Sequence, residues 1–79
     1  MMKGQDIRRA ITVLMTDGKL RTYADIYEHP SMLKYELSSY KAAAHVHMLV
    51  RWGVLQEGPP VRRAGNRVRT FVARFPADT

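Results

Sequence analysis

The sequence predicts a small α+β domain in which three helices precede a C-terminal β-hairpin. Three observations support this prediction. Apolar residues recur with helical spacing in the first two thirds of the 79-residue chain, glycine or proline punctuates the helical runs, and the last third alternates with the period of a strand. A chain of this length is expected to form one domain, 1–79, with a small core. It has no cysteine, so apolar packing rather than disulfides must stabilise it.

The first helix is expected over 5–15. Its apolar residues recur at i, i+3, i+4, i+7 and i+8, which places them on one helical face. These residues are Ile7, Ala10, Ile11, Leu14 and Met15. Gly18 should end the helix, because glycine accepts the left-handed conformation that a helix C-terminus often needs. The next segment, 20–22, has room only for a short bridging strand.

The second helix is expected to begin after Thr22, which forms a weak version of a capping box with Asp25. Ala24, Ile26 and Tyr27 are its candidates for burial. Pro30 cannot continue this helix without losing a hydrogen bond. The segment 31–36 is therefore expected to form one further, separate helical turn.

The third helix is expected over about 39–52, between two candidate N-cap serines and Gly53. A helical wheel assigns four residues to its inner face: Ala42, Val46, Leu49 and Val50. The outer face carries Tyr40, Lys41, Ala43, Ala44, His47 and Arg51. Of the three expected helices, this one has the clearest separation between an inner face and an outer face.

A β-hairpin is expected over about 54–75, with strands near 53–58 and 67–75. Gly58-Pro59-Pro60 should interrupt regular structure, so the prediction assigns a long turn to 58–66. Gly65 and Asn66 supply the torsions of its tip. Three aromatic side chains, Trp52, Phe71 and Phe75, are expected in the core.

Positive charge is concentrated in this predicted hairpin. The chain has 13 Lys and Arg against 7 Asp and Glu, for a formal net charge of +6. Residues 58–75 contain arginines but no acid. This distribution favours an acidic partner, and nucleic acid above the other candidates. A ribosomal or membrane surface, or charge that serves only solubility, stays open as an alternative.

The order of elements resembles the winged helix-turn-helix family, in particular small MarR-like bacterial or phage transcription regulators. The resemblance rests on the run Leu37-Ser38-Ser39-Tyr40-Lys41, followed by Val46, Leu49 and Gly53-Val54-Leu55. It implies a three-helix winged helix-turn-helix with a C-terminal β-hairpin wing, and sequence-specific binding of double-stranded DNA. The segment 28–36 departs from the family, which usually joins the second and third helices more tightly.

The expected recognition helix would enter the major groove with a slim leading face formed by Ala43 and Ala44. Polar side chains beside them are available for bases or phosphates, and two serines lie at the helix N-terminus, where exposed N–H groups favour phosphate. The full set is Ser38, Ser39, Tyr40, Lys41, Ala43, Ala44 and His47. A solvated face with good helix propensity is the alternative interpretation of the same alanines.

The expected wing contacts are Arg62, Arg63, Asn66, Arg67 and Arg69. Arginine suits this role because its planar guanidinium bonds phosphate bidentately and fits a narrow minor groove. If wing, third helix and one arginine of the first helix neutralise about five to seven phosphates, log K should fall against log salt with a slope of roughly −4.5 to −6.

No motif indicates catalysis, so we expect no enzymatic activity and no cofactor. His45 and His47 are two residues apart on a helix and project about 160° from one another, so no metal site is expected.

We expect a cytoplasmic protein without a membrane partner, since no apolar run is long enough to span a bilayer. A homodimer, or side-by-side binding of two copies on DNA, stays open. A winged-helix module that docks proteins in a phage, replication or transcription assembly is the alternative function, and RNA is a further candidate partner.

Overall fold

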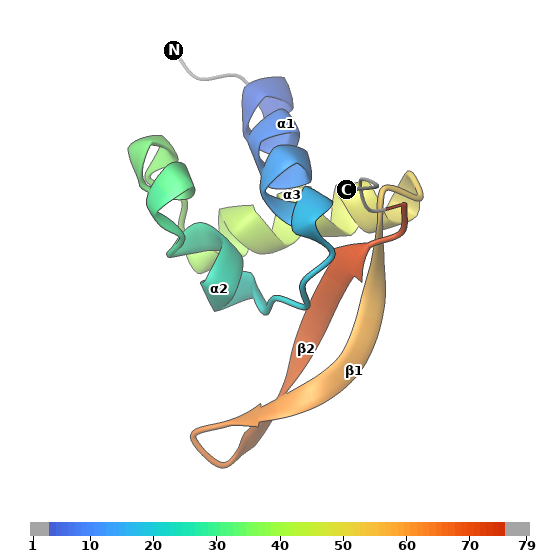
Figure 1. Ribbon diagram of the computed structural model, residues 1–79. Coiled ribbons are helices and arrows are strands. Elements are labelled where there is room, and N and C mark those ends of the chain that lie inside the picture. The colour runs from blue at the N-terminus through green and yellow to red at the C-terminus, as the bar shows by residue number, and fades with distance from the viewer. Residues whose placement is uncertain (1–3, 76–79) are drawn as a thin grey trace.

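The computed structural model describes residues 4–75, so the predicted domain limits at 1 and 79 lie outside the described part. The chain is α+β, with helices first and a two-stranded antiparallel hairpin last (Figure 1). The elements are α1 (Gly4–Leu14), η1 (Met15–Asp17), α2 (Tyr23–Tyr27), η2 (Pro30–Tyr35), α3 (Ser39–Arg51), β1 (Leu55–Arg63) and β2 (Asn66–Ala73). Within 4–75, none of the helices combines the length and apolar character needed to cross a bilayer.

The core lies where α1, α2 and α3 meet the base of the hairpin, and the rest of the hairpin extends away from the helices (Figure 1). Its buried members are Ile7, Ile11, Met15, Ile26, Met32, Val46, Leu49, Leu55, Phe71 and Ala73. Phe71 is fully buried, as predicted. The prediction was wrong for Trp52 and Phe75, which are 56% and 79% exposed. Trp52 follows the last turn of α3 and Phe75 lies past the end of β2, where neighbouring elements no longer cover them.

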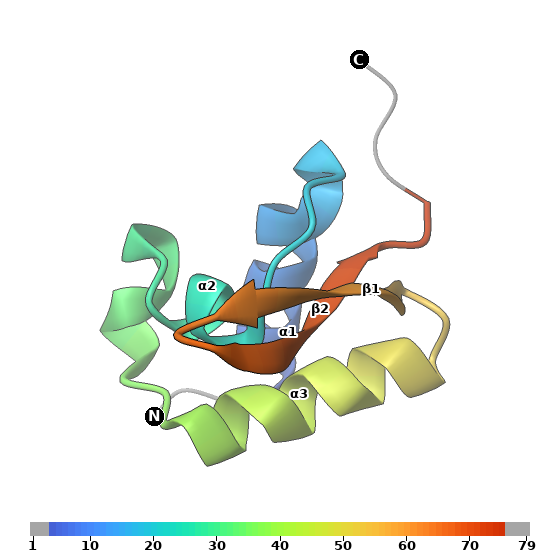
Figure 2. The same ribbon diagram turned by 90° about the horizontal axis from the view of Figure 1, so that it is seen from below.

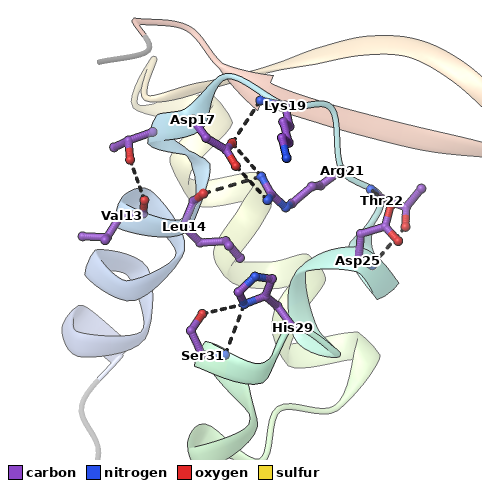
Figure 3. Close-up of polar contacts among 10 residues, drawn as sticks. Val13, Leu14, Asp17, Lys19, Arg21, Thr22, Asp25, His29 and Ser31 are labelled. Atoms are coloured by element: carbon purple, nitrogen blue, oxygen red, sulfur yellow. Dashed lines mark hydrogen bonds and ion pairs between the residues drawn. The ribbon is translucent and has the colours of Figure 1, made fainter. Parts of the chain in front are cut away.

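The start and stop signals of the first two helices are confirmed. Gly18 ends η1 with φ 75°. Thr22 forms both hydrogen bonds of a capping box with Asp25, at 3.1 Å each, and this box begins α2. Between the two helices, the Asp17 carboxylate accepts hydrogen bonds from the guanidinium of Arg21 and the N–H of Lys19 (Figure 3). This arrangement fixes the path of the connection.

The segment after Pro30 forms the expected helical turn, as the 3₁₀ helix η2. His29 caps it with Nδ1, which accepts a hydrogen bond from the Ser31 N–H at 3.1 Å (Figure 3). Met32 anchors η2 in the core with no exposed surface. The longer connection between α2 and α3 is therefore a packed element rather than a loop.

The hairpin departs from the prediction near its prolines. Pro59 and Pro60 lie within β1, and the register shifts between Gly58 and Val61, so a bulge accommodates them. The Pro59 carbonyl accepts a hydrogen bond from the buried Thr70 hydroxyl at 2.8 Å. The long turn predicted over 58–66 was therefore wrong.

The actual turn consists of Ala64 and Gly65, with φ 51° and 81°. Asn66, which was expected in the tip, is the first residue of β2 and pairs with Arg63. Two central residues with positive φ are typical of the type I′ turn, whose twist suits a hairpin.

Arg21 forms the predicted short bridging strand as an isolated bridge to Phe71, through backbone hydrogen bonds of 2.8 and 2.9 Å. This bridge lies on the side of β2 opposite β1, so β2 is central at this point and β1 is the edge. An edge strand tolerates prolines, because their missing N–H groups face outward rather than into a ladder.

Candidate nucleic-acid interface

Local signals define the ends of α3. The Ser38 hydroxyl accepts a hydrogen bond from the N–H of Lys41 at 3.1 Å, so this serine is the N-cap and Ser39 is the first helical residue. Gly53 leaves the helix with φ 78°. The inner face buries Ala42, Val46 and Leu49, as predicted. These bounds confirm the third helix to within one residue.

The side of α3 that faces away from the core forms a ridge of exposed residues, which we call the outer ridge: Tyr40, Ala44, His47, Met48 and Arg51. Tyr40 is 83% exposed. Lys41 is exposed on the flank toward α1, whereas Ala43 is half-buried on the opposite flank. Ala44 is therefore the small residue at the centre of the ridge, and Ala43 contributes less than expected.

Two residues of the outer ridge, Met48 and Arg51, were absent from the expected contacts. Arg51 follows Ala44 by seven positions and His47 by four, so the helical repeat already indicates that these three share a face. The spacing was a sufficient signal for Arg51. Met48 was not suggested by its chemistry, because methionine is more often a core residue.

One face of the hairpin continues the core outward as a basic surface. Side chains alternate along a strand, so the face that buries Phe71 and Ala73 carries Arg69 and Arg67 further along β2. Arg62 of β1 lies directly opposite Arg67. We call Arg62, Arg67 and Arg69 the basic face of the hairpin. Arg63 and Asn66 alternate to the other face, so the structure brings together three of the five predicted wing residues.

A groove of about 300 Å³ separates α3 from the basic face of the hairpin. It is lined by His47, Val50, Arg51, Arg69 and Phe71. In the view from below the hairpin projects along α3 (Figure 2), whereas Figure 1 shows that its base packs near the helix and its tip extends away from it. The outer ridge and the basic face therefore border the same hollow, and each contributes an arginine to it.

Tyr23 of α2 contacts two of the residues that line this groove, Phe71 and His47. Its ring packs on Phe71, with centroids 4.9 Å apart, and its hydroxyl is hydrogen-bonded to His47 Nε2. Partial burial raises the pKa of Tyr23, so the hydroxyl stays protonated at neutral pH. His47 is thus oriented by a neighbour, and its other ring nitrogen, Nδ1, is the one left for an external contact.

The arginines of the hairpin differ in how strongly carboxylates hold them. Arg69 donates two hydrogen bonds to Glu57 Oε1, at 2.6 Å from Nη2 and 3.1 Å from Nε. The hydrogen bond with Glu57 raises the pKa of Arg69. Arg63 reaches Asp25 at 3.3 Å. Arg62 and Arg67 form no ion pair with any residue in 4–75, so they are the most available for a phosphate.

A separate cluster lies on the α1 flank of α3. The Arg8 guanidinium lies over the Trp52 ring, 5.2 Å from its centroid, and its Nη1 is 3.4 Å from His45 Nδ1. Desolvation lowers the pKa of His45, and the nearby charges of Arg8 and Lys41 lower it further. His45 therefore favours its neutral form at neutral pH.

The two histidines of α3 face opposite flanks of the helix. His45 contacts Arg8 of α1, whereas His47 contacts Tyr23 of α2. This divergence follows from their spacing of two residues. Among residues 4–75, no three His, Cys, Asp or Glu side chains gather into a group that could hold a metal ion.

No protein-family model matches the chain, and no curated protein matches it significantly.

Proposed function

We propose that this chain is a winged helix-turn-helix domain that binds double-stranded DNA in a sequence-specific way and regulates transcription. In this proposal α3 is the recognition helix and the hairpin is the wing. The observation that carries the proposal is the shared groove, in which Arg51 of α3 and Arg69 of the hairpin line one hollow. A helix and a basic hairpin so placed can meet one duplex together.

The outer ridge has the shape and chemistry for the major groove of B-form DNA. Ala44 lets the α3 backbone approach base edges, and its methyl group suits a thymine methyl. His47 and Arg51 flank it with donors, and arginine is the commonest partner of guanine. Duplex RNA fits less well, because its major groove is too narrow for side chains to read.

The wing would contact the adjacent backbone or minor groove through Arg62 and Arg67. These arginines lie opposite one another near a tight two-residue turn, so both can reach a single stretch of phosphates. Because phosphate contacts carry no sequence information directly, the wing should set affinity, and the outer ridge should set sequence preference.

One module of this size seldom provides enough specificity for a genomic site. We therefore propose that two copies bind, as a homodimer or side by side on the DNA, and that the site contains two half-sites.

Selection of bound sequences from random duplex DNA tests this function. His47→Ala should change the selected sequence, whereas Arg67→Ala should weaken binding to all sequences about equally. Lys34→Ala, on η2, is the matched control and should alter neither. The proposal is contradicted if the dissociation constant for every duplex is a few tens of micromolar or weaker at moderate salt, because that strength is typical of non-specific binding.

A further inference from the structure

A second groove, of about 420 Å³, lies on the α1 flank of α3. Its walls come from α1, from the last turn of α3 and from the residues that follow α3. The lining residues used below are Arg8, Arg9, Leu49, Trp52 and Val54. We call it the Trp52 groove.

The Trp52 groove presents apolar surface that the fold leaves uncovered. Trp52 is the only tryptophan of the chain and is 56% exposed, although it could bury more area than any other side chain. Arg8 covers one part of the ring by stacking on it. Tryptophan and arginine are the residues most enriched where binding energy concentrates in protein interfaces. The groove thus has the composition of an interface centre.

The charged residues that line the Trp52 groove are all positive. Its lining contains two arginines and no acid. Neither arginine forms an ion pair with any residue in 4–75. An occupant that carries carboxylates would supply the missing partners, while a basic or neutral occupant would leave two guanidinium groups unpaired beside a desolvated ring.

A second copy of this chain fits this groove poorly. A two-fold contact would bring Arg8 and Arg9 of both copies together. In a head-to-tail contact the chain would have to offer a carboxylate beside an apolar side chain. Asp17, Asp25 and Glu57 are held by arginines of their own, which leaves Asp6, Glu28 and Glu36 among the acids of residues 4–75. A head-to-tail copy is therefore one of the outcomes that the test below distinguishes from a separate acidic partner.

The Trp52 groove is also turned away from the proposed DNA contact. Val50 and Trp52 are two residues apart at the end of α3 and project about 160° from one another. Val50 lines the groove beside the hairpin, whereas Trp52 lines the groove beside α1. A duplex on the first flank leaves the second open. A phosphate backbone would also leave the exposed ring of Trp52 without an apolar partner.

We propose that the Trp52 groove docks an acidic peptide segment of a partner protein, with carboxylates paired to Arg8 and Arg9 and one large apolar side chain seated over Leu49 and Val54 against Trp52. This second function goes beyond DNA binding and does not depend on it. Together the two surfaces would make the domain an adaptor between a duplex and an acidic partner.

Random twelve-residue peptides displayed on phage, selected on the full chain, supply unbiased probes. The enriched peptides should combine net negative charge with at least one large apolar residue. The same peptides, synthesised, should shift the emission of Trp52 to shorter wavelength, since they would cover its exposed ring. Arg9→Glu should weaken their binding at least tenfold, and so should Trp52→Ala, measured by calorimetry. Arg67→Glu is the control, which reverses a charge in the hairpin and should leave peptide affinity unchanged.

Several results would overturn the proposal: no enrichment over background, enriched peptides without acidic residues, unchanged peptide affinity in both groove variants, or an Arg9→Glu variant that loses duplex binding as severely as Arg67→Glu. The last would assign the groove to the DNA contact. Loss of a dimer in Trp52→Ala, observed by sedimentation, would assign it instead to a second copy. Circular dichroism of each variant checks that the fold is retained. Arg9 is exposed on α1, so its replacement tests the groove without altering the core.

Discussion

Arg63 near the hairpin tip is bonded to Asp25 at the start of α2, with its two terminal nitrogens 3.3 and 3.4 Å from the two carboxylate oxygens. The same carboxylate completes the capping box with Thr22. Partial burial by itself would raise the pKa of Asp25, but the hydrogen bonds from Thr22 and Arg63 outweigh it and lower the pKa. Asp25 therefore couples the outer part of the hairpin to the helical body.

A double-mutant cycle should measure this coupling. Asp25→Ala loses both the cap and the ion pair, so we expect the free energy of unfolding to fall by about 1 kcal/mol. Arg63→Ala loses only a largely exposed pair, and the coupling energy should be about 0.2–1 kcal/mol in urea unfolding. A coupling of zero would mean that the pair contributes nothing to stability.

Glu57→Gln should strengthen duplex binding. The substitution removes the carboxylate that competes with phosphate for Arg69 and keeps the size of the side chain. We expect a several-fold gain in affinity and a salt slope steeper by about 0.9, since one more cation becomes available. Fluorescence anisotropy at several salt concentrations measures both. The control is Gln56→Glu, which adds an acid to the other face of β1 and should not increase affinity. If the salt slope of Glu57→Gln equals that of the unaltered protein, Arg69 does not contact DNA.

The salt dependence of the unaltered protein should be weaker than the composition suggests. Arg63 and Arg69 are paired with carboxylates, and Arg8 lies on the α1 flank. With about three to five phosphates neutralised, the slope of log K against log salt should be roughly −2.7 to −4.5. A measured slope near −6 would mean that the paired arginines exchange their carboxylates for phosphates on binding.

Stability should fall as the pH drops below about 6.5, the value at which an unfolded histidine titrates. The folded pKa of His45 is lowered, so between the two pKa values the unfolded chain holds the extra proton and is favoured. Stability is then fully present above the unfolded pKa and lost as the pH falls toward the folded one. Urea unfolding from pH 7.5 to 5 measures this trend, and His45→Gln should flatten it. An equal slope in that variant would assign the effect to another group.

Ala64→Asn should stabilise the hairpin. Ala64 holds φ 51°, a left-handed conformation that costs an ordinary residue about 1 kcal/mol and that asparagine tolerates better. We expect a gain of about 0.5–1 kcal/mol in the free energy of unfolding, because asparagine followed by glycine is preferred in this turn. Gly65→Ala, at φ 81°, should instead destabilise. Equal effects of the two changes would mean that the turn is frayed in solution.

Short-range signals made the helical part of the fold predictable. The capping pair Thr22 and Asp25, the N-cap Ser38 and the terminal glycines act within one helical turn, so the bounds of α3 were predicted to within one residue. The buried face of α3 followed from the helical repeat in the same way. The period of two in the last third likewise predicted a hairpin with Phe71 inside.

By itself the sequence determined the class of the fold, the helix ends and the placement of the arginines on a hairpin, because each depends on neighbours within a few residues. Tertiary structure decided the rest. The edge position of β1 allowed Pro59 and Pro60 into a strand, and the packing of α1 against α3 left Trp52 exposed beside Arg8. Tertiary structure also decided which arginines of the hairpin are paired with a carboxylate. Glu57 bonds Arg69 across 12 residues of chain, and Asp25 bonds Arg63 across 38. Contacts of that separation depend on how the elements pack, which no local pattern encodes.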